Sequence, residues 1–584
     1  MSSTVACDPT EVALKSFFLG PQSENANWVT ELLVEIFERW FRWRRDKFPE
    51  DGSAISSLDQ ASPEFCERRQ QVLGLLQQLT HRFEKELPKF SPRYVGHMFS
   101  EISLPALMGH ILTLLHNPNI ISKESATVAA DIENEAIEAL GHMLGLGKAF
   151  GHFTSGGTVA NFEAVVRAGA RLHCWLGLGA VQGGMTLFEA AHMGWARYRQ
   201  GLTMIDEHQL TPYLPERSGP WDAGRALEQA FDRPFRGPVL IVPRTGHYSW
   251  KKAARVFGVG EANLRYVDSD SQGRYQVDHL QQHLLDCQLM QQPVLAVVSV
   301  TGTTETGAVD PVHAIQDLLD RWRDQQGLHI WHHIDAAYGG FLCSLLRKDP
   351  LHKEEGLEAV LSPHVFQSLS AVGRGDSVTV DPHKLGYVPY SSGAFLARQR
   401  DDYTCVQTLA PYIDYRNVGD RGPYTLEGSR SAAGAVATWL TARSIGLHQA
   451  GYGLLMARTI RQKQKLEQWL LQKLPSARVY PGCDTNLLCF CVADAGDQVS
   501  RCNQRTLRIL ERLNSESLYF LSKTHFPIGS NGVTRDFIQS WQGQADTDQL
   551  VMLRLSLMNP FFDSHELDVN HIEHLVFALS ELSD

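Results

Sequence analysis

The 584-residue sequence lacks three features that would place it in other classes of protein. No apolar run approaches the roughly 18 residues that a membrane-spanning helix requires. Residues 1–20 show no basic stretch followed by an apolar one, and no small-residue cleavage site. A basic excess is also missing, since 54 Lys and Arg face 65 Asp and Glu, a net charge of −11. We therefore expect a cytoplasmic protein that binds neither membranes nor nucleic acid.

Paired cysteines are missing as well, although the chain has ten cysteines. None forms a CxxC pair, and Cys489 and Cys491 stand two residues apart in an apolar run, so both thiols would point to one face of a strand. Scattered cysteines of this kind predict reduced thiols rather than a disulfide framework or a zinc site. We expect no bound metal.

The hydrophobic fraction of 43% and the charged fraction of 20% are those of a soluble globular protein, and the chain is too long for a single core. Residues 1–119 repeat apolar side chains at helical spacing over 31–41, 72–83 and 107–115. An aromatic stripe on the first of these helices, from Phe37 to Trp43, favours an interface over a ligand site. We interpret this part as a helical N-terminal segment.

The middle of the chain, residues 120–425, alternates short β-rich runs with helical stretches such as 132–144 and 314–322. The predicted strands are 239–242, 293–300, 330–334, 377–380 and 393–396. This alternation indicates an α/β fold with a mostly parallel, doubly wound sheet. Residues 426–584 combine a long helical stretch, 432–474, with strands at 486–492 and 551–556, which predicts a small α+β domain that closes over the site.

The segment Asp381-Pro382-His383-Lys384 follows one of these apolar runs and precedes a turn. Lys384 is therefore placed where a lysine can be walled in and partly desolvated, as an amine that forms a Schiff base with an aldehyde cofactor must be. A second signal is Asp335, which ends the buried run 330–334. A carboxylate at this edge of a sheet can keep the pyridine nitrogen of pyridoxal phosphate protonated, or it can merely cap a turn.

Two further motifs suit the same cofactor. Ser155-Gly156-Gly157-Thr158 runs into a helical pattern, and small residues at a helix start let backbone amides approach a phosphate. His247 follows the run 239–242, where an imidazole can stack on a flat ring, although a histidine at a strand end is also commonly just a satisfied polar group.

These four motifs, at their spacings, resemble the group II pyridoxal-phosphate-dependent amino acid decarboxylases of fold type I, and the resemblance extends from about residue 17 to the C-terminus. It implies a seven-stranded-type sheet and a homodimer in which the N-terminal segment wraps around the other subunit.

The family reaction needs a proton donor at Cα, for which Tyr412 is the best match and Tyr415 the reserve. The resemblance assigns Lys384 to the Schiff base, Asp335 to the ring nitrogen, His247 and Ala337 to the two ring faces, Thr304 to the phenolic oxygen, Gly157, Thr158 and His383 to the phosphate, and Gly428 and Ser429 to the phosphate of the other subunit.

Asp381 departs from many relatives, which carry asparagine three residues before the lysine. A carboxylate close to a dianionic phosphate is repelled, so we expect Asp381 to turn away or to share a proton. Bacterial tyrosine decarboxylases carry the same Asp-Pro-His-Lys, so the change marks a branch of the family.

The substrate side also follows from the resemblance. The segment 92–110 is most similar to bacterial aspartate 1-decarboxylases, which implies L-aspartate as substrate and β-alanine as product, with L-tyrosine second and L-glutamate third. A transaminase or an aldehyde-forming oxidative decarboxylase would keep the same cofactor residues. The residues matched to substrate positions are His97, Ser100, Tyr390, Arg554 and Ser556.

Overall fold

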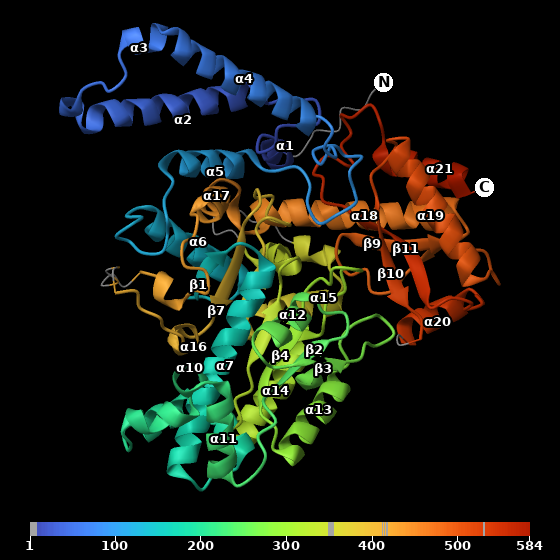
Figure 1. Cartoon of the computed structure of the whole chain (residues 1–584). Coiled ribbons are helices and arrows are strands. Elements are labelled where there is room, and N and C mark those ends of the chain that lie inside the picture. Colours follow the sequence, from blue (N-terminus) through green and yellow to red (C-terminus); the bar gives the residue numbers. More distant parts are fainter. Residues whose placement is uncertain are drawn as a thin grey trace.

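Two β-sheets organise the chain (Figure 1). The computed structural model describes residues 9–348, 356–411, 413, 415, 419–529 and 532–583. The larger sheet has seven strands in the order β1-β7-β6-β5-β4-β2-β3. Its strands are β1 (Phe150–Thr154), β2 (Val239–Pro243), β3 (Leu264–Val267), β4 (Val294–Val300), β5 (His332–Asp335), β6 (Ser377–Val380) and β7 (Gly393–Ala397).

This sheet confirms the predicted α/β class. The pairs β2–β3, β2–β4, β4–β5 and β5–β6 are parallel, whereas β7 runs antiparallel to both β6 and β1. All seven residues of β4 are buried, which explains its continuous apolar sequence, since helices cover both faces of such a sheet. The helices around this sheet are α6 (Ala129–Leu144), α7 (Gly157–Gln182), α8 (Leu187–Ala191), α9 (Trp195–Leu202), α10 (Pro215–Ser218), α11 (Pro220–Phe231), α12 (Ser249–Val256), α13 (Val277–Met290), α14 (Val312–Gln326), α15 (Pro363–Ser370) and α16 (Arg400–Thr404).

The second sheet is antiparallel, in the order β10-β11-β9-β8. Its strands are β8 (Ala477–Val479), β9 (Leu487–Val492), β10 (Ser522–Pro527) and β11 (Gln549–Ser556). Leu466, Ile509 and Leu575 of three different helices join one buried cluster with the strand residues Phe490 and Leu553. The helices of this part are α17 (Ala433–Thr441), α18 (Leu454–Lys473), α19 (Val499–Ser515), α20 (Gly532–Ser540) and α21 (His571–Ser583).

The predicted helical stretch 432–474 is not one helix. It is divided into α17 and α18 by two wider turns at residues 442–446 and 449–453. Gly446 lies in the first turn with φ of 87°, in the left-handed region, and a Cβ there would meet the ring of His448 at 2.2 Å. The glycine therefore allows a reversal that apolar periodicity alone does not indicate.

The N-terminal part contains α1 (Pro9–Lys15), α2 (Ala26–Lys47), α3 (Ser57–Ala61), α4 (Pro63–Phe83) and α5 (Leu104–His116). Figure 1 shows α2 and α4 extending beyond the rest of the chain. Neither helix buries a single residue. Among the described residues, no helix is long and apolar enough to cross a bilayer. The domain boundaries at 119 and 425 stay predictions.

Candidate active site

A cavity of about 310 Å³ lies at the edge of the larger sheet where the parallel strands end. The chain enters this edge from β2, β4, β5 and β6, so residues far apart in sequence meet there. Eight predicted site residues and Asp381 line its wall. The eight residues are Gly157, Thr158, His247, Thr304, Asp335, Ala337, His383 and Lys384.

Asp335, the last residue of β5, is 4% exposed and held in place by two donors. Asn161 Nδ2 donates to its Oδ2 at 2.8 Å, and the backbone N–H of Ala337 donates to Oδ1 at 3.2 Å. The amide oxygen of Asn161 in turn lies 3.2 Å from Nε2 of the buried His333. The carboxylate is thus fixed in orientation before any ligand binds.

The N-terminus of α7 forms another wall. Gly157 is its first residue, and no side chain caps the helix, so the first backbone N–H groups are free of an intrahelical partner. A Cβ on Gly157 would come within 2.7 Å of Asp381 Oδ2 and 3.2 Å of the Ala337 methyl. Only glycine lets these segments meet, and the helix end can take an anion such as a phosphate.

Lys384 reaches the cavity from the loop after β6. Its Nζ lies 3.0 Å from Asp381 Oδ2, and His383 Nε2 lies 3.4 Å from the same oxygen. Burial opposes the charge on Asp381, but Lys384 and His383 lower its pKa below the usual range. His383 also stacks on Tyr390 with 4.0 Å between ring centroids.

His247 and Thr304 lie on the other walls. The backbone N–H of Ser249 donates to His247 Nδ1 at 3.3 Å, which leaves Nε2 to carry the proton in the neutral ring. Burial lowers the pKa of His247, against the opposite effect of Asp335, so the neutral ring is favoured. The carbonyl of Thr304 accepts from Arg554 Nε at 2.8 Å.

A second cavity of about 330 Å³ shares His383 and Lys384 with the first. Ser100 and Tyr390, two of the predicted substrate residues, line it. Most of the remaining wall is apolar or aromatic, from Phe99, Ile102, Tyr387, Val388 and Pro389, with Lys89 and Glu101 beside them. The hydroxyl of Ser100 is buried and has no hydrogen-bond partner among the described residues.

The other three predicted substrate residues lie outside both walls but near them. Arg554 is 5% exposed, and its guanidinium donates only to carbonyl and hydroxyl oxygens within the described part of the chain, including Gly96 at 3.4 Å. It lies close enough to His97 to lower the pKa of that ring, after the larger effect of burial. Ser556 Oγ lies 3.2 Å from the Tyr338 hydroxyl, and Tyr338 lines the first cavity.

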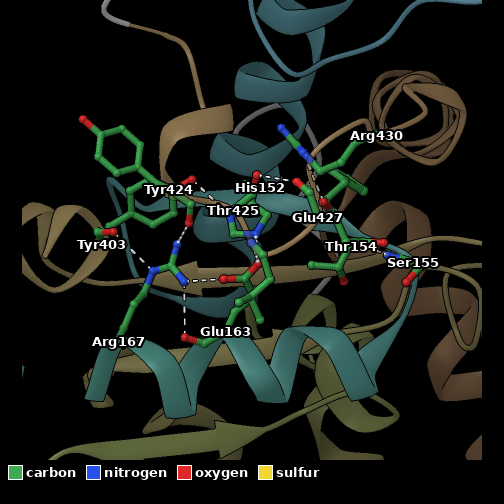
Figure 2. A network of polar contacts seen from close by, with 12 residues as sticks. His152, Thr154, Ser155, Glu163, Arg167, Tyr403, Tyr424, Thr425, Glu427 and Arg430 are labelled. Carbon is green, nitrogen blue, oxygen red and sulfur yellow. Dashed lines mark hydrogen bonds and ion pairs between the residues drawn. The ribbon is translucent and has the colours of Figure 1, made fainter. Parts of the chain in front are cut away.

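The segment after the predicted proton-donor loop is tied to the phosphate side of the first cavity (Figure 2). Glu427 Oε2 accepts from the backbone N–H of Ser155 at 3.1 Å, and Glu163 Oε1 accepts from that of Leu426 at 2.8 Å. Arg167 donates to both Glu163 and the Tyr424 carbonyl. Burial opposes the charge on Glu163, yet His152 and Arg167 hold its pKa at about 2. This network, whose members His152, Glu163 and Arg167 are buried, holds residues 424–427 in place.

Gly428 and Ser429 do not line the cavity of their own chain. The Ser429 hydroxyl accepts from Asn119 Nδ2 at 3.1 Å, and a Cβ on Gly428 would meet nothing within 4 Å. Their predicted contact across a subunit boundary stays a prediction. Tyr412 lies outside the described residues, and Tyr415 is described but lines neither cavity.

Sequence reasoning missed Asn161, Glu101 and Lys89. Asn161 is four residues after Gly157 on α7, so the helical spacing places its side chain one turn above the phosphate end. That spacing was a usable signal for Asn161. No comparable signal existed for Glu101, a 6% exposed carboxyl whose pKa burial raises to about 7.

A seven-stranded sheet with a lysine, an aspartate and a glycine-started helix at one edge defines the pyridoxal-phosphate-dependent enzymes of fold type I. Within that class, residues 234–493 match the family described as "Pyridoxal-dependent decarboxylase conserved domain". This part of the chain carries the decarboxylase domain, and with the relatives below it supports a pyridoxal-phosphate-dependent amino acid decarboxylase.

Relatives and solved structures agree with this assignment. An L-tyrosine decarboxylase of Enterococcus faecium is 28% identical over 497 residues, which cover 81% of this chain and 80% of the relative. An aspartate 1-decarboxylase of Aliivibrio fischeri is 25% identical over 509 residues, 84% and 80% of the two chains. The crystal structure of mouse CSAD matches 94% of this chain and 98% of its own with a TM-score of 0.61 at 20% identity, a likeness of fold.

The residues of the first cavity fit pyridoxal phosphate. The uncapped start of α7 suits the phosphate, the fixed carboxylate of Asp335 suits the ring nitrogen, and Lys384 Nζ suits the aldehyde. The buried hydroxyl of Thr245, another wall residue, has no partner among the described residues and offers a further donor. The chain thus has a separate group for each end of the cofactor.

Proposed function

We propose that the chain decarboxylates L-tyrosine or a closely similar phenolic amino acid to its amine. The observation that carries this proposal is the second cavity, whose wall is largely apolar and aromatic and contains the unpartnered hydroxyl of Ser100. An aromatic side chain fills such a space, and a phenol can satisfy the buried hydroxyl. Three L-tyrosine decarboxylases, 26–28% identical over 77–95% of this chain, support the same substrate class.

The chemistry is divided among the residues of the first cavity. Lys384 supplies the amine for the aldehyde, and Asp335, oriented by Asn161, holds a proton at the ring nitrogen. His247 presents a neutral ring to the face of the cofactor. When bound, pyridoxal phosphate supplies the electron sink for the electron pair left at Cα as carbon dioxide departs.

Protonation of Cα completes the reaction. We assign it to a tyrosine of the loop 405–421, Tyr412 before Tyr415. The Glu163–Leu426 and Glu427–Ser155 contacts hold residues 426 and 427, which follow this loop in the chain, beside Ser155 of the first cavity, and loops commonly carry such groups.

L-Aspartate, the substrate implied by segment 92–110, is the second candidate. Its supporting observation is Arg554, a buried guanidinium with no carboxylate at ion-pair distance among the described residues, although it is close enough to Glu305 to lower the pKa of that carboxyl against the larger effect of burial. Such a charge can pair with a substrate carboxylate. The same guanidinium can serve the α-carboxylate that every amino acid carries, so Arg554 does not by itself favour a dicarboxylic substrate.

We also propose that the enzyme is a homodimer. Helices α2 and α4 contain 22 and 21 residues without one buried side chain, and they expose a series of large apolar residues. Helices gain most of their stability from packing an apolar face, so these two need a partner surface. The exposed apolar side chains are Val34, Phe37, Phe41, Trp43, Val72, Leu73, Leu75, Leu76, Leu79 and Phe83.

The deciding experiment is kcat/KM for L-tyrosine, L-phenylalanine, L-aspartate and L-glutamate, with carbon dioxide and the organic product both measured. The proposal predicts tyrosine first, and phenylalanine lower by about 10-fold or more, because a site that pairs a hydroxyl leaves polar groups unpaired without it. Ser100→Ala should lower the value for tyrosine and leave that for phenylalanine unchanged. A higher value for aspartate would select the second candidate, and an aldehyde or keto acid as main product would contradict amine formation.

A further inference from the structure

Asp381 is the buried acid that adjoins both the lysine and the phosphate side of the cofactor cavity. It follows β6 and is 2% exposed. We expected it to turn away from the phosphate side or to share a proton. It does not turn away, since a Cβ on Gly157 would lie 2.7 Å from its Oδ2, and one on Gly393 would lie 2.8 Å from its Oδ1.

This position makes the carboxylate a neighbour of any phosphate at the start of α7. The first N–H groups of that helix are the donors for the phosphate, and Asp381 lies against its first residue. Oδ1 of Asp381 is buried without a hydrogen-bond partner among the described residues. One carboxylate oxygen therefore still has its hydrogen-bonding capacity unused.

The titratable groups that face Asp381 come from two segments, its own β6–β7 loop, which also carries Tyr390, and the loop after β2. Lys384 and His383 belong to its own loop, His247 lies on the loop after β2, and the Tyr390 phenol is close enough for Asp381 to raise its pKa. In the cofactor-free chain, burial raises the pKa of Asp381, and Lys384 and His383 outweigh burial. When Lys384 turns to the aldehyde, Asp381 loses its ammonium partner while burial remains.

We propose that Asp381 is a positioning residue that holds the cofactor phosphate through a shared proton. An ionised carboxylate can only accept hydrogen bonds, and a phosphate dianion has only acceptors. Two such groups in contact repel, and one of them takes up a proton instead. Because a phosphate monoester has its second pKa near 6, a chain with asparagine at 381 would bind the dianion at neutral pH. This inference is independent of the substrate.

The direct test is the ³¹P NMR signal of the holoenzyme from pH 6 to 9. The wild-type signal should keep the chemical shift of a monoanion at pH 8, where free pyridoxal phosphate is a dianion, and the Asp381→Asn signal should have the dianion shift. If the wild-type signal is that of a dianion at pH 8, the proposal is wrong, whether or not the variant folds.

A second measurement uses a probe that cannot form a Schiff base with Lys384. The probe is 4-deoxypyridoxine 5′-phosphate, which has no aldehyde, added to the full chain freed of cofactor. If binding takes up one proton more in the wild type than in Asp381→Asn, the ratio of the wild-type Kd to the variant Kd should rise about tenfold per pH unit above pH 7. Asp268→Asn is the matched control, because Asp268 follows β3 at the same sheet edge, pairs with Arg244 and lies outside the cavity. Equal pH slopes in the wild type and Asp381→Asn would overturn the shared proton.

Discussion

Asn161 and Asp335 are joined by a 2.8 Å hydrogen bond across 174 residues of sequence. The bond links the second turn of α7 to the end of β5. His333 Nε2 lies 3.2 Å from the amide oxygen of Asn161 and helps to fix the orientation of that amide. Helix α7 thus carries both the uncapped N-terminus that we propose for the phosphate and the residue that orients Asp335. Gly157 and Asn161 are four residues apart, so about one helical turn separates the groups that we propose for the two ends of the cofactor.

Replacement of Asp335 by asparagine should lower kcat far more than it weakens binding of the cofactor. The phosphate contacts and the lysine survive, but the ring nitrogen loses the carboxylate that keeps it protonated. We expect kcat to fall about 10³-fold or more, as for removal of an electrostatic partner that acts in the transition state. The measurement is kcat together with the Kd of the cofactor, and a near-normal kcat would refute the role of Asp335.

Asn161→Ala should give a smaller loss of the same kind. One hydrogen bond to a charged group contributes about 1.5–3 kcal/mol, so kcat should fall roughly ten- to 100-fold. The visible absorption of the bound cofactor should become pH-dependent, a change that a purely structural role would not produce. Asn161→Asp is the contrasting variant, because it places a second carboxylate against Asp335. A pH-independent spectrum in Asn161→Ala would show that Asp335 needs no orienting partner.

Much of the site was predictable because its chemistry is local. Lys384, Asp335, His247 and Gly157 each end or follow a short apolar run, and parallel strands bring such ends to one edge. The strands β2, β4, β5, β6 and β7 were predicted for the same reason. The Asn161–Asp335 bond was not, since a contact between residues so far apart depends on tertiary packing.

The remaining differences also have physical causes. Strand β1, Phe-Gly-His-Phe-Thr, has no continuous apolar run and leads directly into the Ser155-Gly156-Gly157 motif, so the apolar pattern did not indicate a strand there. The turns between α17 and α18 depend on left-handed Gly446 rather than on a proline. The apolar wall of the second cavity combines residues 99–102 with residues 387–390, two segments whose pairing no local pattern reveals.

The N-terminal helices give a prediction about assembly. Phe41 on α2 is 46% exposed and Leu76 on α4 is 57% exposed in the single chain. If a second copy covers them, Phe41→Glu and Leu76→Glu would bury a charge and should convert the dimer to a monomer in sedimentation velocity. Leu289→Glu, on α13 and 83% exposed, is the matched control and should stay dimeric. A wild-type monomer with full activity would contradict the proposed interface.

Buried histidines predict how stability depends on pH. Burial lowers the pKa of His192 and His333 to about 3 and that of His332 to about 4. Between pH 6.5 and 4 the unfolded chain therefore binds protons that the folded chain does not, and the free energy of unfolding falls as the pH falls. Each such proton contributes about 1.4 kcal/mol per pH unit.

Four carboxyls of the described residues, those of Glu101, Glu305, Asp310 and Asp402, act in the opposite direction because burial raises their pKa values. Burial raises the pKa of Glu101 and of Asp310 to about 7, so the stability they contribute is present at low pH and lost as the pH rises from about 4 to 7. Burial also lowers the pKa of His173 and His571 to about 4, so the histidines outnumber these carboxyls, and we expect urea unfolding of the holoenzyme to show a net rise in stability from pH 4 to 6.5. His192→Gln should flatten this slope, and a slope of the opposite sign would contradict the assignment.

The central claim is that Lys384 binds the cofactor at the edge of the larger sheet. The most direct measurement is mass spectrometry of the borohydride-treated holoenzyme after proteolysis. We expect one phosphopyridoxyl adduct, on Lys384, and neither adduct nor turnover in Lys384→Ala. An adduct on another lysine in the wild-type chain, or normal turnover in Lys384→Ala, would contradict it.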